Sequence, residues 1–211
     1  MKILVIGASQ GTGALAVEAA LARGHQVTAF ARSPAKLAIE HPKLDKVRGD
    51  FHQQASVEGA VRGHDAVIIT ASATSLAGFK ENPRYFSQGT AYVIEAMKAN
   101  DVRRLVVLSA LGVGESRALS PFLVRKLLIG FILKLPFEDH ERQEQMTRES
   151  GLDWVIVRPG RLTDGPARRQ YVKKTAVEKV PSSISRADVA DFLVEAAESE
   201  RWVRQAVQIG G

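Results

Sequence analysis

Glycines near the start of the chain are spaced as a phosphate-binding turn requires. The segment Gly7-Ala8-Ser9-Gln10-Gly11-Thr12-Gly13 ends the apolar run Lys2–Gly7 and opens the Ala-rich segment Thr12–Arg23. Glycine allows a tight turn and a close approach of the backbone to a pyrophosphate, and the first N–H groups of a helix carry partial positive charge. The segment therefore predicts a dinucleotide site, with a purely structural turn as the alternative.

The residues that follow the next apolar run indicate which dinucleotide would bind. A site for NAD places Asp or Glu here to accept from the ribose 2′-hydroxyl, whereas this chain has Arg32 and Ser33, with Lys36 one turn later. A guanidinium can form two hydrogen bonds to a 2′-phosphate, and the Ser33 hydroxyl can add a donor. We expect NADP(H) as the cofactor; the alternative is that Arg32 points into solvent.

Two further loops are placed to contact the rest of such a cofactor. Asp50 and Phe51 follow the third strand-like run, where an acid can accept from the adenine amino group and the next side chain can flank the ring. Ala71, Ser72 and Ala73 follow the fourth run, where small residues let the backbone lie beside a ribose. Loops of this kind can also be small for steric reasons alone.

The sequence lacks the Tyr-x-x-x-Lys pair with which many reductases donate a proton. None of the three tyrosines, Tyr85, Tyr92 and Tyr171, has a lysine four residues later, and none follows closely on Ser109. Hydride transfer to a conjugated acceptor such as a flavin, quinone or bilin is still possible, because these acceptors delocalise the incoming charge and can take a proton from water. Catalysis would then consist mostly of positioning.

Ser109 and His140 are the candidate catalytic residues. Ser109 follows the fifth strand-like run and could contact the cofactor carboxamide or the acceptor, or merely cap the strand end. His140 could donate to an acceptor, although a histidine in so charged a segment is more often a solvated surface residue. The remaining histidines are scattered and the chain has no cysteine, so we expect no metal site.

Strand-like and helix-like segments alternate along the chain. We expect strands at Lys2–Gly7, Gln26–Ala31, Leu44–Arg48, Asp65–Thr70, Arg104–Ser109, Asp153–Arg158 and Ala206–Ile209, and helices at Thr12–Arg23, Pro83–Asn100, Glu138–Ser150 and Ser185–Ser199. This alternation predicts an α/β fold, a doubly wound parallel Rossmann-type sheet whose ligands lie beyond the carboxyl ends of the strands. We expect one domain, 1–211, with a small C-terminal substrate region at about 160–185.

Composition narrows the location of the protein. The chain of 211 residues has no cysteine, in keeping with a reducing compartment, and no signal-type cleavage site follows its first residues, so we expect a cytoplasmic protein. The most apolar stretch, Pro121–Phe137, has Leu127–Leu133 as its longest uncharged run, too short to cross a bilayer. We therefore expect no membrane contact, and interpret this stretch as core packing or as a lid over an aromatic acceptor.

The net charge of the chain indicates which kinds of partner it could bind. The formal net charge of +6 favours an anionic partner such as a phosphorylated cofactor, or indicates only a basic surface. An RNA-associated protein is a further hypothesis, but basic residues are not clustered with aromatic ones, so we expect no nucleic acid. The expected partner is a small conjugated acceptor, and the expected state is a monomer or weak homodimer.

These motifs together resemble the atypical short-chain dehydrogenase/reductase group. GASQGTG, ARSPAK, GDF, SALG and RPGRL carry the likeness, which extends over nearly the whole chain. Within the group, the chain is most similar to the NmrA-like NAD(P)H-binding proteins and to the biliverdin reductase B/flavin reductase type. In contrast to the flavin-reductase relatives, it has Gln10 in place of a glycine, and Arg161 replaces a histidine of the mammalian form.

The resemblance implies a role for each motif. Ser109 would lie near the nicotinamide, and His140 and Arg161 would border the substrate pocket. The residues implied to contact the pyrophosphate are Gly7, Ser9, Gln10, Gly11, Thr12 and Gly13, and those implied to close over the nicotinamide are Pro159, Gly160, Arg161 and Leu162.

Two functions then compete. The first is an NADPH-dependent oxidoreductase that transfers hydride to a conjugated acceptor such as a flavin, quinone or bilin. The second is a non-catalytic, NADP(H)-sensing regulatory protein of the NmrA-like type, which would use Arg32 for binding and carry out no turnover. The missing Tyr-x-x-x-Lys pair is compatible with both.

Overall fold

The computed structural model describes residues 1–71, 79, 81–119 and 133–211. Its centre is a sheet in the order β3-β2-β1-β4-β5-β6-β10-β8, in which β8 alone pairs antiparallel. These strands are β1 (Lys2–Ile6), β2 (Gln26–Ala31), β3 (Leu44–Arg48), β4 (Ala66–Ile69), β5 (Arg104–Leu108), β6 (Asp153–Pro159), β8 (Val172–Lys174) and β10 (Gln205–Gly210). The predicted doubly wound Rossmann-type fold is confirmed.

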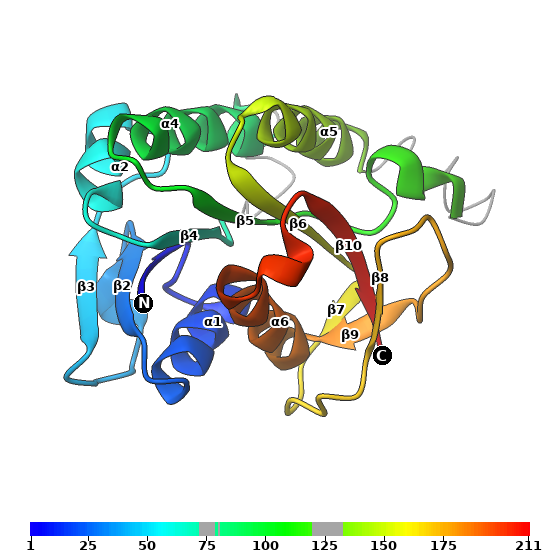
Figure 1. Ribbon diagram of the computed structural model, residues 1–211, viewed down its shortest axis with the longest axis horizontal. Coiled ribbons are helices and arrows are strands. Elements are labelled where there is room, and N and C mark those ends of the chain that lie inside the picture. The colour runs from blue at the N-terminus through cyan, green and yellow to red at the C-terminus, as the bar shows by residue number, and fades with distance from the viewer. Residues whose placement is uncertain (72–78, 80, 120–132) are drawn as a thin grey trace.

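Helices cover both faces of the sheet (Figure 1). One face carries α1 (Gly11–Ala22) and α6 (Arg186–Glu198), and the other carries α2 (Gln54–Val61), α4 (Tyr85–Ala99) and α5 (Lys134–Glu149). Successive side chains of a strand point to opposite faces, so β1 divides its residues between two apolar cores. A strand buried on both faces is continuously apolar, which explains why β1, β4 and β5 were recognisable in the sequence.

The order in which strands are added to the sheet changes side at β1: β2 and β3 lie on one side of it, and β4 and β5 lie on the other. Strand β1 pairs with β2 on one side and with β4 on the other, both parallel. The connections that leave the carboxyl ends of β1 and β4 therefore run to opposite faces, and a crevice opens between them, where ligands of doubly wound sheets bind. The glycine segment begins at this point.

Element boundaries agree with the predicted ranges to within a few residues. Both β2 and β3 coincide with them, whereas α5 begins at Lys134, four residues before the predicted Glu138. Helix α2 was not predicted. It is only eight residues long and contains Gly59, but Val57, Ala60 and Val61 recur at helical spacing and are buried against the sheet.

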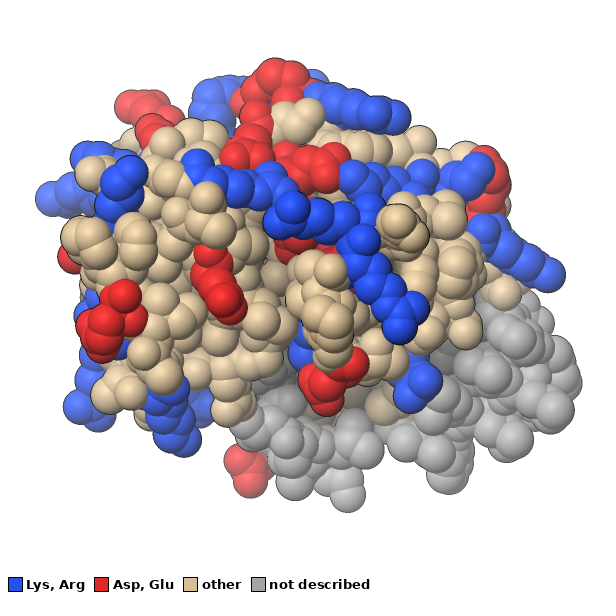
Figure 2. Space-filling model, turned by 90° about the horizontal axis from the view of Figure 1, so that it is seen from below, with Lys and Arg blue, Asp and Glu red and all other residues tan. Residues whose placement is uncertain are grey.

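The predicted substrate-side region, 160–185, forms small strands of its own. Strand β7 (Arg161–Thr163) pairs with β9 (Ser183–Ser185), and β8 adds to the sheet edge at β10. The region has six Lys and Arg against two acidic residues. Figure 2 shows one face of the whole molecule, on which Lys and Arg form a band with Asp and Glu beside it. The contact of the region with a substrate stays a prediction. The proposed lid or core segment lies outside the described residues from Pro121 to residue 132.

No helix in the described ranges is long and apolar enough to span a membrane. Among the same residues, no three His, Asp or Glu side chains come together as metal ligands could.

Candidate cofactor-binding and active site

Two glycines of the opening segment are required by close backbone approaches. Gly7 has φ +88°, and a Cβ there would lie 2.7 Å from the Ala71 nitrogen. At Gly13 a Cβ would lie 2.3 Å from the Gly7 carbonyl oxygen. A third, Gly11, has φ +58° with open space where a Cβ would be. The turn therefore packs tightly on its protein side and is open on the other, as a backbone cradle for a ligand would be.

The N-terminus of α1 is suited to an anion. Gln10 occupies the N-cap position without a side-chain hydrogen bond to the helix, and the first turn contains no acidic residue. The first N–H groups of a helix need partners from outside the helix, and the helix dipole favours negative charge there. A pyrophosphate fits this position, because it would supply both the hydrogen-bond acceptors and the charge.

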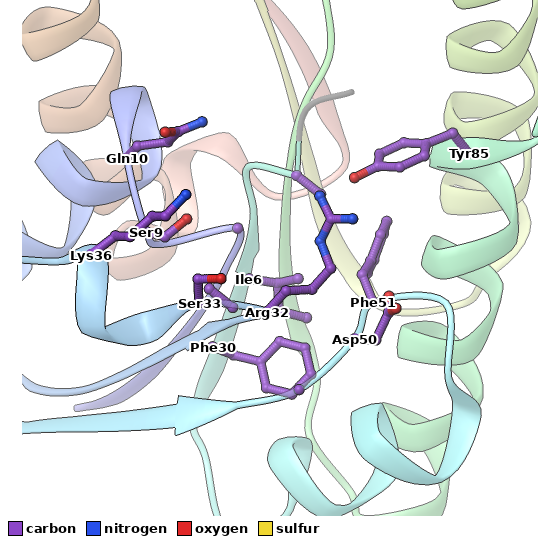
Figure 3. A pocket seen from close by; sticks show the side chains of 14 residues that line it. Ile6, Ser9, Gln10, Phe30, Arg32, Ser33, Lys36, Asp50, Phe51 and Tyr85 are labelled. Atoms are coloured by element: carbon purple, nitrogen blue, oxygen red, sulfur yellow. The ribbon is translucent and has the colours of Figure 1, made fainter. Parts of the chain in front are cut away.

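A pocket of about 310 Å³ lies next to this turn (Figure 3). Segments after β1, β2, β3 and β4 form its walls, so it lies at the carboxyl edge of the sheet where the chain changes direction. The predicted residues that it brings together are Gly7, Ser9, Gln10, Arg32, Ser33, Lys36, Asp50, Phe51 and Ala71. Gly11, Thr12 and Gly13 continue into α1 beside it. Ser72 and Ala73 lie outside the described residues.

Positive charge and hydroxyl groups occupy the mouth of this pocket. Arg32 and Lys36 are exposed. Figure 3 shows the Arg32 side chain extending across the pocket, with Ser33 beside its base and Lys36 and Ser9 on the far side. Donors on both sides of one opening could hold a phosphate between them. The arrangement fits the 2′-phosphate of NADP(H).

Asp50 and Phe51 line the pocket where the chain leaves β3. Phe51 is 6% exposed, and its ring fills the space that a Cβ at Gly89 of α4 would take, 2.3 Å away. The Asp50 Oδ1 accepts a hydrogen bond from the His52 backbone N–H at 2.9 Å. The carboxylate keeps further lone pairs with which it could accept from an adenine amino group.

Tyr85 completes the pocket and was missed in the sequence. It is the first residue of α4, yet it lines the pocket opposite the glycine turn, and its hydroxyl points toward Arg32 (Figure 3). Burial raises the pKa of Tyr85, with the nearby Arg32 opposing the shift. The ring lies 4.4 Å from that of His52. The local sequence gives no signal for this role, because Tyr85 is far along the chain from the rest of the pocket.

The start of α4 is fixed by α5. Asp139 of α5 is fully buried, and its Oδ2 accepts from the backbone N–H groups of Phe86 and Ser87 at 2.6 and 3.3 Å. Its Oδ1 accepts from the Ser87 hydroxyl at 2.6 Å. A carboxylate at a helix N-terminus satisfies free N–H groups and interacts favourably with the dipole. Asp139 thereby holds Tyr85 at the pocket rim.

The other predicted residues lie farther along the carboxyl edge, outside this pocket. Ser109 follows β5 and is 5% exposed. The segment Pro159–Leu162 lies beside the same loop, because the Leu111 N–H donates to the Pro159 carbonyl at 2.8 Å. Arg161 is exposed, whereas Leu162 packs against the core beneath α6. This end of the crevice is where a nicotinamide would lie if adenosine occupied the pocket.

His140 is neither freely solvated nor in the pocket. Its ring stacks on Phe86 at 3.9 Å between centroids, and its Nδ1 lies 2.9 Å from the Gln143 Oε1. Burial lowers the pKa of His140 below its usual value. A neutral ring that donates from Nδ1 to Gln143 offers only an acceptor at Nε2. The suggested role of His140 as a donor stays a prediction, and it requires the protonated ring.

The sequence also gave no sign of a buried charge network beneath Ser109. Arg158 is 1% exposed and Glu144 3%. Arg158 donates to Glu144 through Nε at 2.9 Å and also through Nη2, and to Glu115 at 2.9 Å. The hydrogen bond from Arg158 is the main cause that lowers the pKa of Glu115 to about 2. These residues come from β6, α5 and the turn Gly114–Leu119, so only the fold brings them together.

The geometry defines a Rossmann-type dinucleotide-binding protein, and comparison with known proteins identifies its family. Residues 7–200 match the NAD(P)H-binding family, and the chain belongs to it. An uncharacterised chloroplastic protein of Arabidopsis thaliana is 28% identical over 99% of this chain and 76% of its own length. The solved structure of ChuY, an anaerobilin reductase from Escherichia coli O157:H7, has a TM-score of 0.81 at 25% identity over 99% of this chain and 96% of its own.

A second reductase is similar over a shorter span. The (4-alkanoyl-5-oxo-2,5-dihydrofuran-3-yl)methyl phosphate reductase of Streptomyces griseus is 31% identical over 74% of this chain and 46% of its own length. Together with the fold, these likenesses confirm the predicted relationship to short-chain and biliverdin-type reductases. They place this chain among NAD(P)H-binding proteins with reductase relatives.

Proposed function

We propose that this protein is an NADPH-dependent reductase that transfers hydride to a small conjugated acceptor such as a flavin, quinone or bilin. The observation that carries the proposal is the pocket itself. An open glycine turn and an uncapped helix N-terminus lie beside a mouth lined by Arg32, Ser33 and Lys36. These groups match, in order, the pyrophosphate and the 2′-phosphate of NADPH.

The residues of the crevice would act by binding and orienting. NADPH supplies the hydride. The turn and α1 hold the pyrophosphate, the pocket between Phe51 and Tyr85 receives adenine, and Ser109 lies at the opposite end of the same edge. The sequence has no Tyr-x-x-x-Lys pair, so an acceptor that delocalises charge and takes its proton from water suits the site.

The relatives support this class of acceptor. ChuY is described as an anaerobilin reductase, and bilins are conjugated. The Streptomyces griseus enzyme reduces a dihydrofuranyl methyl phosphate whose ring carbon–carbon double bond is conjugated with carbonyl groups. In the region 160–185, Lys173 and Lys174 are paired with Glu195 and Glu178. However, Arg161, Arg168 and Lys179 of the same region are exposed and would favour an acceptor that bears acidic groups.

Loss of NADPH absorbance on mixing the protein with NADPH and FMN, a quinone or biliverdin tests the proposal. We expect oxidation faster than the uncatalysed rate with at least one acceptor, and slower oxidation with NADH. Tight NADPH binding without oxidation in all three mixtures would instead support the NADP(H)-sensing regulatory function. Absence of NADPH binding would contradict both.

A further inference from the structure

The buried neighbours of Ser109 determine whether its hydroxyl donates or accepts in each hydrogen bond. Its Oγ lies 2.6 Å from the Glu144 Oε1. Arg158 donates to both oxygens of the Glu144 carboxylate, and Arg148 approaches it at 3.7 Å. A carboxylate contacted by guanidinium groups in this way is ionised and can only accept. The hydroxyl hydrogen of Ser109 is therefore committed to Glu144.

A hydroxyl whose hydrogen is committed offers only lone pairs to any other partner. Ser109 stands at the carboxyl end of β5 with its backbone N–H bonded to the Val157 carbonyl at 2.8 Å, so its position is fixed by β6 as well. Toward the crevice it can accept a hydrogen bond but cannot donate one. It is correspondingly unsuited to protonate an acceptor.

The network that sets this direction extends beyond Glu144 and Arg158. Arg158 also binds Glu115 at 2.9 Å, and Glu115 binds Arg148 at 3.1 Å. Gly114 has φ +55°, and a Cβ there would lie 2.8 Å from the Arg158 Nη2, so glycine lets the turn close over the guanidinium. Burying an ion pair is costly unless its geometry is good and its remaining hydrogen bonds are satisfied, and here both conditions hold.

We infer that Glu144 and Arg158 are positioning residues that make Ser109 a hydrogen-bond acceptor for the carboxamide NH₂ group of the nicotinamide. The inference rests on the proposed function, since it requires NADPH in the crevice. In this inference Glu144 and Arg158 orient the carboxamide only through Ser109 and do not contact the cofactor themselves. An amide NH₂ satisfies Ser109, whereas a methyl group in the same place leaves its lone pairs unpaired.

The test compares dissociation constants for NADPH and for its 3-acetylpyridine analogue, in which a methyl group replaces the amide NH₂. Fluorescence titration measures both without turnover. We expect the protein to bind NADPH about fivefold to tenfold more tightly than the analogue, as the loss of one hydrogen bond predicts. In Ser109→Ala the two constants should agree within about twofold.

Glu144→Ala tests the role of the carboxylate. Because the Glu144 Oε1 accepts from both Ser109 and the Arg158 Nε, its removal leaves the Ser109 hydroxyl without an internal acceptor and free to donate toward the cofactor. The preference for NADPH should vanish, because the carbonyl oxygen present in both ligands can then accept. Glu149→Ala on the exposed side of α5 is the matched control and should keep the preference of the unmodified protein.

The outcomes separate this inference from the proposed function. If Ser109→Ala keeps the preference, or if the unmodified protein has none, the inference is wrong while NADPH reduction can still hold. Should Glu144→Ala weaken both ligands equally and keep their ratio, the carboxylate has only a structural role. If Glu144→Ala fails to fold, Ser109→Ala still decides the direction of the hydrogen bond. Failure of the unmodified protein to bind either dinucleotide overturns the proposed function and the inference together.

Discussion

The two ends of the crevice treat charge in opposite ways. At the adenosine end, Arg32 and Lys36 are exposed at the mouth of a pocket. At the other end, Glu144 and Arg158 are almost completely buried and are paired with each other. The first arrangement leaves positive charge available to a ligand, and the second neutralises its charge within the protein.

This difference separates affinity from orientation. Exposed cations can attract and bind a phosphate, but their long side chains fix its position only when it is bound. A buried ion pair contributes no attraction for a ligand, yet it holds a neighbouring hydroxyl in one direction before the ligand arrives. The adenosine end would thus select the cofactor, and the other end would orient its reactive ring.

The largest effect should come from breaking the buried pair. Glu144→Ala leaves the Arg158 guanidinium buried without its main partner, and such a loss costs about 3–5 kcal/mol of unfolding free energy. Urea unfolding followed by circular dichroism measures this change. Glu149→Ala on the exposed side of the same helix should change the free energy by less than about 0.5 kcal/mol. Similar losses in both variants would contradict the role of the pair.

Next in size is the loss of the exposed cation. Arg32→Ala should weaken NADPH binding about tenfold or more, because charge-assisted hydrogen bonds contribute roughly 1.5–3 kcal/mol, and should leave NADH binding nearly unchanged. Titration with both dinucleotides measures the ratio. Arg62→Ala, an exposed arginine just before β4 at the opposite edge of the sheet, is the control. Equal losses for NADPH and NADH would refute the assignment of Arg32 to the 2′-phosphate.

Tyr85 gives the adenosine end an aromatic side chain beside its exposed cations. Tyr85→Ala should weaken NADPH and NADH by a similar factor of about three to ten, since stacking on a base contributes roughly 1 kcal/mol or more. Tyr85→Phe keeps the ring and should change NADH affinity by less than about twofold. If Tyr85→Phe lowers the affinity for NADPH alone, the hydroxyl rather than the ring makes the contact.

The smallest effect concerns acid stability at the buried end. The pKa of Glu115 lies at about 2 in the folded protein, mainly because Arg158 donates to it. Its contribution to stability is therefore present above its ordinary pKa of 4.5 and is lost as the pH falls toward about 2. Glu115 is half exposed, so the contribution should be below about 1 kcal/mol.

Glu115→Gln checks this expectation. The difference in unfolding free energy between the variant and the unmodified protein should be largest near neutral pH and should shrink at about pH 3. A difference that is constant across this range would show that ionisation of Glu115 does not stabilise the fold.

Local patterns were enough to predict the charged end of the crevice. Arg32, Ser33 and Lys36 follow directly on a strand, and the glycine turn joins a strand to a helix, so chain order alone places them at the same edge of the sheet. Tyr85 was missed because it reaches the pocket from the opposite face, where Asp139 fixes the start of its helix. Helix α2 was missed because it is short and weakly apolar.

The doubly wound sheet and the glycine turn were predictable from the order of residues alone, because apolar runs and glycine spacing are properties of consecutive residues. The environment of Ser109 was not predictable in this way, because it forms only when distant segments pack together. In the sequence, Glu144 is one of many charged residues in a helix and Arg158 ends a strand. Both become buried only when α5 packs on β6. Hydrogen-bond direction depends on that burial and pairing, which residues distant in the chain create only on folding.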